Sequence, residues 1–380
     1  MDLRITDDQQ LLLETTRKFL ESTAPLETVR RLADEEPAGF DRDWWRSGAE
    51  LGWTSLLVSE ADGGGSVSGH GLLDLVLVAE SMGSLVSPGP LVPTNVVAEA
   101  LARSGSADQR RRLLPGLMSG ASVAAWCLGA PAAGIDSGGR VGAKLGDTGV
   151  VLDGVSGPVE AGGQADVYLV TAATEDGVAQ FIVPSDSPGV TVDPANSLDL
   201  VRRFAQIRFD QVAVGHDAAL GVAETTVADI EHQLQTVAVL QCAEMVGAMD
   251  RVFEFTVEYA ADRYSFGRPL ASYQALKHRF ADMKVWLEAA HATAGAAARA
   301  VDSDSTSAAE LVSVAKAYIG DRGPVILQDC VQIHGGIGVT WDHDLHLYLR
   351  RVVVDRTQWG TPRDHRERVA VAMGMEGDVP

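Results

Sequence analysis

The sequence predicts an α+β protein with three parts: an N-terminal helical domain over residues 1–121, a central antiparallel β domain over 122–222 and a C-terminal four-helix bundle over 223–380. Three observations lead to this order. A chain of 380 residues exceeds what one hydrophobic core usually organises. Apolar residues recur at helical spacing toward both ends. Between them, short Val, Ile and Leu runs are divided by Gly, Asp, Ser and Pro turns.

The N-terminal domain begins with a capping box, in which Thr6 is followed three residues later by Gln9. Leu11, Leu12 and the pair at 19–20 then recur at helical spacing. Further helical patterns follow at 44–45, 72–80 and 95–102, and Pro/Gly-rich breaks separate them at 60–65 and 87–90.

The β domain is predicted from apolar runs at 150–152, 167–170, 181–183 and 207–209. From Thr225 to Ala372 the pattern is helical again. Residues 237–249 are apolar on nearly every face, which predicts a helix inside the bundle.

Composition excludes several classes of function. A formal net charge of -21 opposes binding to nucleic acid or to an anionic membrane. No apolar stretch approaches the roughly 20 residues of a membrane helix, and no basic-then-apolar leader is present, so a cytoplasmic location is expected. Cys127, Cys242 and Cys330 are far apart, odd in number and without a Cys-x-x-Cys pair, which argues against a disulfide framework or a zinc site.

Two segments carry a resemblance to a known family. Residues 262–270 read Asp-Arg-Tyr-Ser-Phe-Gly-Arg-Pro-Leu, followed by Tyr-Gln-Ala-Leu-Lys-His at 273–278, and residues 332–338 read Gln-Ile-His-Gly-Gly-Ile-Gly. In this domain order they resemble the Arg-x-x-Phe-Gly and Gln-x-x-Gly-Gly-x-Gly segments of the acyl-CoA dehydrogenase family, and the resemblance covers nearly the whole chain. It implies FAD as cofactor, α,β-dehydrogenation of an acyl-CoA thioester in lipid or steroid catabolism, and an electron-transfer flavoprotein as electron acceptor.

The matching residues suit the nucleotide end of FAD. A pyrophosphate needs guanidinium or backbone N–H donors, and glycine lets the backbone approach it closely. Taken singly, Arg263 would more simply form a salt bridge and the glycines a helix break; together they favour cofactor binding. The predicted cofactor-binding residues are Arg263, Ser265, Phe266, Gln274, Gln332, Ile333, His334, Gly335 and Gly336.

The catalytic and flavin-ring positions depart from the family pattern. Where the family has Tyr-Glu-Gly-Thr with the catalytic base, residues 358–361 read Gln-Trp-Gly-Thr, and the indole of Trp359 cannot accept a proton. The alternative base position falls on Val237, and the substrate-contacting Arg that follows it is Ala238. The ring-contacting segments read Cys-Leu-Gly-Ala-Pro-Ala-Ala-Gly-Ile at 127–135, with Gly129 and Ile135 for Thr and Ser, and Pro-Val-Glu at 158–160.

These losses follow a pattern within the family. In its homotetramers, one subunit supplies the ring contacts and the base, and its neighbour lends the segments that hold the nucleotide end. This chain keeps the lent set only. It therefore resembles the base-lacking subunit of heteromeric α2β2 members, which act on CoA thioesters of bulky acids, including steroid side chains, with half the usual number of flavins. The expected partner is a paralogous acyl-CoA dehydrogenase subunit.

Two other hypotheses stay open. Glu244, two helical turns beyond Val237 in the apolar helix, is the remaining candidate for a catalytic base in a self-sufficient homo-oligomer. A structural ion pair with a buried Arg or Lys is the favoured interpretation of this carboxylate. A scaffold subunit that binds no flavin is the third hypothesis.

Three further groups receive structural interpretations. His343 and His346 are interpreted as packed interface histidines because no second cluster completes a metal site. Arg202 and Arg203 are interpreted as a solvated turn, with phosphate binding as the alternative. Residues 364–368 are interpreted as an exposed helical face with paired charges.

Overall fold

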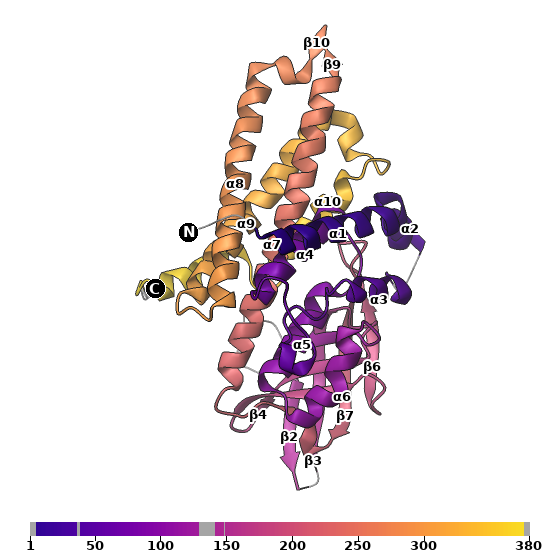
Figure 1. Ribbon diagram of the computed structural model, residues 1–380, viewed down its shortest axis with the longest axis vertical. Helices are drawn as coiled ribbons and strands as arrows, with labels where there is room; N and C mark the ends of the chain where they lie inside the picture. The colour runs from indigo at the N-terminus through magenta and orange to yellow at the C-terminus, as the bar shows by residue number, and fades with distance from the viewer. Residues whose placement is uncertain (1–4, 36–38, 129–140, 148, 376–380) are drawn as a thin grey trace.

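The computed structural model describes residues 5–35, 39–128, 141–147 and 149–375. Helices flank a sheet on both sides in sequence, as predicted (Figure 1). The first helical part contains α1 (Asp7–Thr23), α2 (Leu26–Glu35), α3 (Arg42–Glu50), α4 (Gly71–Ser84), α5 (Leu91–Ser104) and α6 (Ala107–Met118). The last contains α7 (Thr226–Asp262), α8 (Gln274–Asp302), α9 (Ala308–His334), α10 (Leu345–Thr357) and α11 (Pro362–Ala372).

The predicted start of α1 is confirmed in atomic detail. The backbone N–H of Gln9 donates to Oγ1 of Thr6 at 3.2 Å, and the backbone N–H of Thr6 donates to Oε1 of Gln9 at 3.0 Å. The amide of Gln9 also donates to the buried carboxylate of Asp74 in α4 at 2.8 Å. Gln9 therefore helps to fix both the start of α1 and the position of α1 on α4.

The sheet has the strand order β6-β7-β3-β2-β4-β5-β8, with β1 paired to β4. Most neighbours are antiparallel, but β1 and β2 each run parallel to β4, so the prediction of a wholly antiparallel sheet was wrong at these two pairings. Apolar runs divided by turns identify strands and do not report their direction. The strands are β1 (Ala124–Cys127), β2 (Val141–Gly146), β3 (Gly149–Glu160), β4 (Val167–Thr174), β5 (Gly177–Pro184), β6 (Val190–Ala195), β7 (Phe204–Val214) and β8 (Ala219–Leu220).

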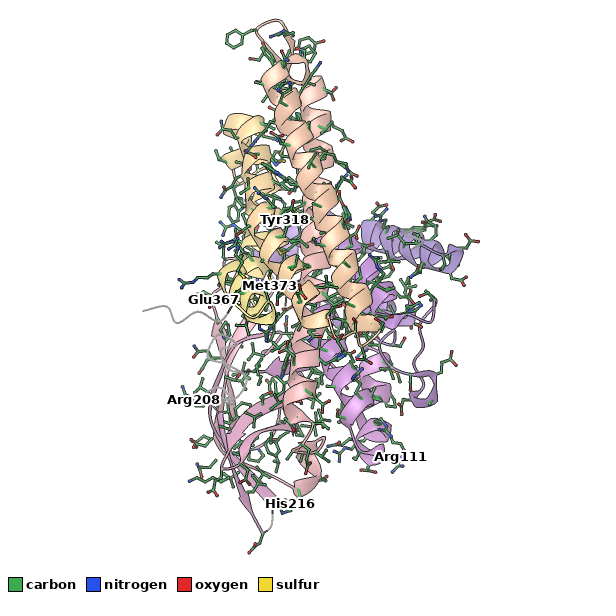
Figure 2. All side chains as sticks on the ribbon, turned by 90° about the vertical axis from the view of Figure 1, so that its left-hand side faces the viewer. Arg111, Arg208, His216, Tyr318, Glu367 and Met373 are labelled. Atoms are coloured by element: carbon green, nitrogen blue, oxygen red, sulfur yellow. The ribbon has the colours of Figure 1, made fainter. Side chains whose placement is uncertain are left out.

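The helix α7 is the central helix of the structure. Residues 237–249 are all buried, which confirms the predicted bundle helix. Beyond the crossing with α4, the antiparallel pair α7–α8 projects away from the sheet and ends in a hairpin of β9 (Tyr264–Ser265) and β10 (Arg268–Pro269) (Figure 1). A view turned by 90° shows the same projection, with His216 of the β domain at the opposite end (Figure 2). No described helix has the length and apolar character needed to cross a membrane.

Two glycines let α4 and α7 approach closely. A Cβ added at Gly247 would lie 1.9 Å from the backbone oxygen of Glu80, and one added at Gly83 would lie 2.1 Å from the backbone oxygen of Glu244. Both contacts are with backbone atoms, which cannot rotate away. The crossing of the N-terminal helices with the bundle therefore depends on glycine at both positions.

Substituting Gly247→Ala is expected to lower stability by about 1–3 kcal/mol or more, because the added methyl group must push two packed helices apart. Thermal or urea unfolding of the purified protein measures the change. Gly295→Ala in α8 is the matched control, since its Cβ would meet only the mobile guanidinium of Arg299 at 3.2 Å. Removing a mid-helix glycine there should leave stability equal or slightly higher. Equal unfolding midpoints for the two variants would contradict this account of the crossing.

Candidate functional site

The Arg-x-x-Phe-Gly segment forms the hairpin at the tip of α7 and α8. Phe266 is 98% exposed, with a left-handed backbone at φ +49°. The hairpin is held by its own contacts: the hydroxyl of Tyr273 donates to the backbone oxygen of Ser265 at 2.7 Å, and the guanidinium of Arg268 lies 3.8 Å from the centroid of the Tyr273 ring. The fold therefore presents Phe266 on a braced turn that faces solvent.

The Gln-x-x-Gly-Gly-x-Gly segment ends α9 and lies beside the C-terminal end of α7. The ring of Tyr259, one turn before Arg263, stacks on His334 at 4.2 Å, and its hydroxyl donates to the backbone oxygen of His334 at 3.3 Å. Gly335 follows at φ +66°. Two segments about 60 residues apart in sequence thus meet at one end of the bundle.

Six of the nine predicted cofactor-binding residues are exposed to solvent, and we call this set the tail surface: Arg263, Phe266, Gln274, Gln332, Gly335 and Gly336. Ser265 and Ile333 are half-buried. His334 is 4% exposed, so its imidazole is not available to a ligand. Within the described residues, the side chains of Arg263, Gln274 and Gln332 form no hydrogen bond or ion pair, and a Cβ at Gly335 or Gly336 would meet nothing within 4 Å.

These properties fit the nucleotide end of FAD. A guanidinium and two amides supply donors, a ring face is available for stacking, and the glycines leave the backbone accessible.

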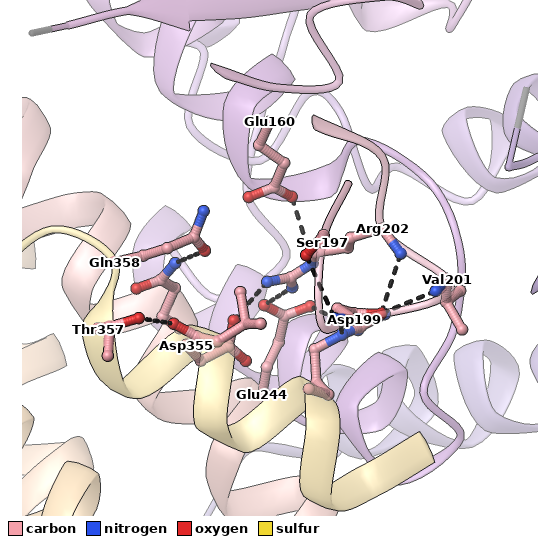
Figure 3. A network of polar contacts seen from close by, with 12 residues as sticks. Glu160, Ser197, Asp199, Val201, Arg202, Glu244, Asp355, Thr357 and Gln358 are labelled. Atoms are coloured by element: carbon pink, nitrogen blue, oxygen red, sulfur yellow. Dashed lines mark hydrogen bonds and ion pairs between the residues drawn. The ribbon is translucent and has the colours of Figure 1, made fainter. Parts of the chain in front are cut away.

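Glu160, from the segment at 158–160 that aligns with the family's flavin-ring contacts, has different surroundings, because it lies in a buried cluster of charges (Figure 3). Arg202, in the loop between β6 and β7, is 5% exposed. Its Nη1 lies 2.6 Å from Asp355 of α10, its Nε lies 3.3 Å from Glu160 at the end of β3, and its Nη2 donates to Glu244 of α7. The interpretation of Arg202 as a solvated turn was therefore wrong, because its charge is paired with carboxylates from three distant elements.

A second arginine completes the cluster. Arg351 of α10 is fully buried, donates to Asp199 and lies 4.0 Å from Glu244. Arg203, the neighbour of Arg202, is half-buried and donates to backbone oxygens of Leu32 and Leu200. Both residues of the Arg202–Arg203 pair thus have structural contacts.

The buried cluster has more carboxylates than guanidinium groups, which shifts their pKa values. Burial, opposed by Arg202, raises the pKa of Glu160 to about 7, and burial raises the pKa of Asp355 to about 6. Burial opposes ionisation of Asp199 too, but Arg351 and Arg202 hold its pKa below the ordinary value. The excess of carboxylates over guanidinium groups thus favours the neutral form of Glu160 and Asp355 relative to exposed carboxyl groups.

Glu244 lies between the two arginines, so the favoured interpretation of a structural ion pair agrees with its contacts. The carboxylate is 2% exposed and bound by Arg202. Val237 and Ala238, at the alternative base and substrate-arginine positions, are also buried.

Trp359, at the position of the family's base, packs against the β domain. Its ring stacks on Trp126 of β1 at 5.1 Å with an interplanar angle of 15°, and its backbone is left-handed at φ +58°. The adjacent Gln358 accepts from Gln241 at 2.8 Å, and Gln241 accepts from the buried ammonium of Lys316 at 2.8 Å. Gly129 and Ile135 lie outside the described residues. The side chains of Trp359, Gln358 and Glu160 therefore contact other residues of the chain.

His343 and His346 pack against neighbouring rings, in agreement with their interpretation as packed histidines. His343 packs edge-on against His334 at 4.7 Å, and His346 stacks on Trp341 at 4.5 Å. The three cysteines are free and buried. Along residues 364–368, Arg366 and Arg368 pair with Asp321 and Glu231 of other helices. His365 is the exception to an exposed face, because it is buried and its Nε2 lies 3.2 Å from the backbone oxygen of Trp359.

Comparison with known proteins identifies the family. The acyl-CoA dehydrogenase N-terminal domain matches residues 6–121 and the acyl-CoA dehydrogenase C-terminal domain matches residues 227–374. The chain belongs to the acyl-CoA dehydrogenase family. FAD, the cofactor expected from the sequence, is the cofactor of this family.

Individual relatives align along nearly the whole chain. Acyl-CoA dehydrogenase IpdE2 of Mycolicibacterium smegmatis is 29% identical over 96% of this chain and 98% of its own length. Acyl-CoA dehydrogenase FadE27 of Mycobacterium tuberculosis is 30% identical over 92% of each chain. A chain of the ChsE4–ChsE5 complex from Mycobacterium tuberculosis is 26% identical, with a TM-score of 0.87 and complete coverage of both chains.

The sequence pointed to Glu244 and missed the rest of the buried cluster. Asp199, Arg351 and Asp355 lie in segments without a motif, and Lys316 lies within α9. Arg351 and Asp355 are spaced at i and i+4 in a helix that follows apolar residues. This spacing was the one local sign of a buried charged face.

Replacing Glu160→Gln is expected to change how stability depends on pH. The raised pKa means that the folded protein keeps a proton on Glu160 which the unfolded chain releases between pH 4.5 and about 7. Below pH 4.5, Glu160 therefore contributes about 3 kcal/mol to the free energy of unfolding. This contribution is lost as the pH rises through 7. The difference between the unfolding midpoints of the wild type and the variant (wild type minus variant) should decrease as the pH is raised from 5 to 8. The exposed Glu175→Gln is the control, and parallel pH profiles for wild type and Glu160→Gln would refute the assignment.

Proposed function

We propose that this chain is the non-catalytic subunit of a heteromeric acyl-CoA dehydrogenase and contributes the nucleotide-tail contacts to an FAD shared with a paralogous catalytic subunit. The assembly dehydrogenates an acyl-CoA thioester between its α and β carbons and passes electrons to an electron-transfer flavoprotein. When bound, FAD supplies the hydride acceptor for the β carbon. The catalytic subunit supplies the base that removes the α proton.

One contrast carries the proposal: the tail surface faces solvent with its donors free of contacts within the described chain, whereas the side chains at the base position and at ring-flanking position 160 contact other residues of the same chain. Trp359 fills the base position and stacks on Trp126. Glu160, at a ring-flanking position, is bound to Arg202. A chain with these properties can hold the phosphates and adenine of FAD, and it lacks the residues that would support chemistry at the flavin ring.

The roles of the tail residues follow from their chemistry. Arg263 provides a permanent positive charge for the pyrophosphate, which a chain of net charge -21 does not offer in general. Gly335 and Gly336 allow backbone N–H groups to approach the phosphates. Phe266 offers a ring face to the nucleotide. These residues bind and orient, and none of them exchanges a proton with substrate.

Glu244 is a poor base in this setting. Its carboxylate pairs with Arg202 and lies 4.0 Å from Arg351, and a general base needs an oxygen that can reach the substrate. Removing a proton from substrate would also require breaking a buried ion pair, which costs about 3–5 kcal/mol. The homo-oligomer with Glu244 as base is thus the weaker alternative.

The heteromer also agrees with the relatives. A solved chain that matches this one over its full length belongs to the ChsE4–ChsE5 complex. A partner encoded near this chain's gene and carrying a carboxylate at the position of Trp359 is the expected catalytic subunit.

Flavin stoichiometry tests the proposal directly. The chain should be purified alone and co-purified with its paralogous neighbour, and bound FAD measured by absorbance per chain. The expected result is little flavin in the lone chain and about half a flavin per chain in the complex, together with enoyl-CoA formation only by the complex. One flavin per chain and activity in the lone sample would support the Glu244 homo-oligomer. Absence of flavin from both samples would support the scaffold hypothesis.

The variant Arg263→Ala is expected to weaken FAD binding by the complex about 10- to 100-fold, because a hydrogen bond to a charged phosphate contributes roughly 1.5–3 kcal/mol. Fluorescence titration of the flavin-depleted complex measures the affinity. Arg111→Ala is the matched control, since Arg111 is an exposed arginine on α6 at the other end of the molecule (Figure 2). Equal FAD affinity for both variants, with an intact complex, would remove Arg263 from the cofactor site.

A further inference from the structure

Three metal-ligating side chains meet where α4, α7 and α8 come together. Glu80 lies on α4, Asp250 on α7 and His291 on α8, and one ligand atom of each lies within 4.8 Å of the others. The Nε2 atom of His291 is 2.6 Å from Oδ2 of Asp250. In the described part of the chain, no other group of His, Cys, Asp and Glu side chains meets this geometry.

The glycine crossing explains why these residues converge. Glu80 stands three residues before Gly83 and Asp250 three residues after Gly247, so each carboxylate lies one turn from a glycine on the same helix face. Because the two helices approach to backbone contact at these glycines, the carboxylates are brought together. His291 reaches them from α8, which packs against both helices.

Glu80 gives a second, independent indication of a ligand. Its half-buried carboxylate forms no hydrogen bond and no ion pair within 4 Å among the described residues. It lies beside Asp250 and His291, which are paired with each other, so it is the member of the group whose charge has no partner. A bound cation would pair with that charge.

The cluster also has access to solvent. A cavity of about 450 Å³ adjoins it, lined by both carboxylate residues together with Arg17, Glu21, Arg251 and Glu254. Its charged side chains are of both signs, and the two cluster carboxylates add negative charge on one wall. The cavity offers an entry path and room for a water ligand.

From this geometry we propose that Glu80, Asp250 and His291 bind a divalent transition-metal ion, of which Zn²⁺ is the best match, as a clamp between the N-terminal helices and the bundle. One imidazole nitrogen and two carboxylate oxygens are zinc ligands, and water from the cavity supplies the fourth position. Ligand atoms about 2.1 Å from a tetrahedral ion lie about 3.4 Å apart. Small side-chain rotations bring the three atoms to that spacing.

Metal binding can be tested on the metal-free full-length chain. Isothermal titration with ZnCl2 should give one strong site per chain, and saturating Zn²⁺ should raise the unfolding midpoint because the ion binds the folded state. The His291→Asn variant should weaken the strong site at least tenfold and lose the midpoint shift. Glu254→Gln is the control, since Glu254 lines the same cavity and lies outside the three ligands.

Anomalous diffraction from wild-type crystals soaked in Zn²⁺ keeps the test decisive if a variant folds poorly. An ion within about 2.2 Å of one atom from each of the three side chains supports the proposal. An ion bound only elsewhere, or the same affinity in wild type and His291→Asn, would overturn it. None of these measurements involves flavin, so the outcome is separate from that of the heteromeric function.

Discussion

The relation between the β domain and the bundle depends on the buried guanidinium of Arg202. Its three nitrogens are each directed to a different carboxylate, on β3, α7 and α10. Taking one guanidinium and three carboxylates out of water is expensive, and only good geometry repays the cost. Once formed, the arrangement is hard to leave, because moving the loop that carries Arg202 would strand buried carboxylates on three elements. This interaction therefore fixes where the sheet sits on the helices.

The same interaction decides what the ring-side segments can do. Glu160 and the residues around Trp359 come from the segments that in the family contact the flavin ring and carry the base. Here Glu160 neutralises Arg202, and Gln358 extends a polar chain through Gln241 to Lys316. Side chains that satisfy one another in the interior are not available to a ligand.

The sequence was sufficient where local chemistry determines structure. The Thr6–Gln9 capping box, the buried helix at 237–249 and the glycine-bounded motifs each follow from residues within a few positions of one another. Arg202 was mispredicted because its three partners lie 42, 42 and 153 positions away, where no periodicity reports them. The parallel pairings of β1 and β2 with β4, and the convergence of Glu80, Asp250 and His291, are equally non-local. The tail residues were identified as a set by their motifs, and their shared exposure needed the fold.

Two residues of the tail surface, Gly336 and Phe266, have features that the chain's own packing does not require. At Gly336 neither a positive φ nor a neighbouring atom demands glycine, since an added Cβ would meet nothing within 4 Å. Phe266 is almost fully exposed and holds a left-handed backbone that is unfavourable for an aromatic residue. The strained backbone lowers stability, and an aromatic ring left in solvent contributes nothing to folding in return. Such features are expected where the ring serves a contact outside the chain, and a nucleotide held against a second subunit would be such a contact.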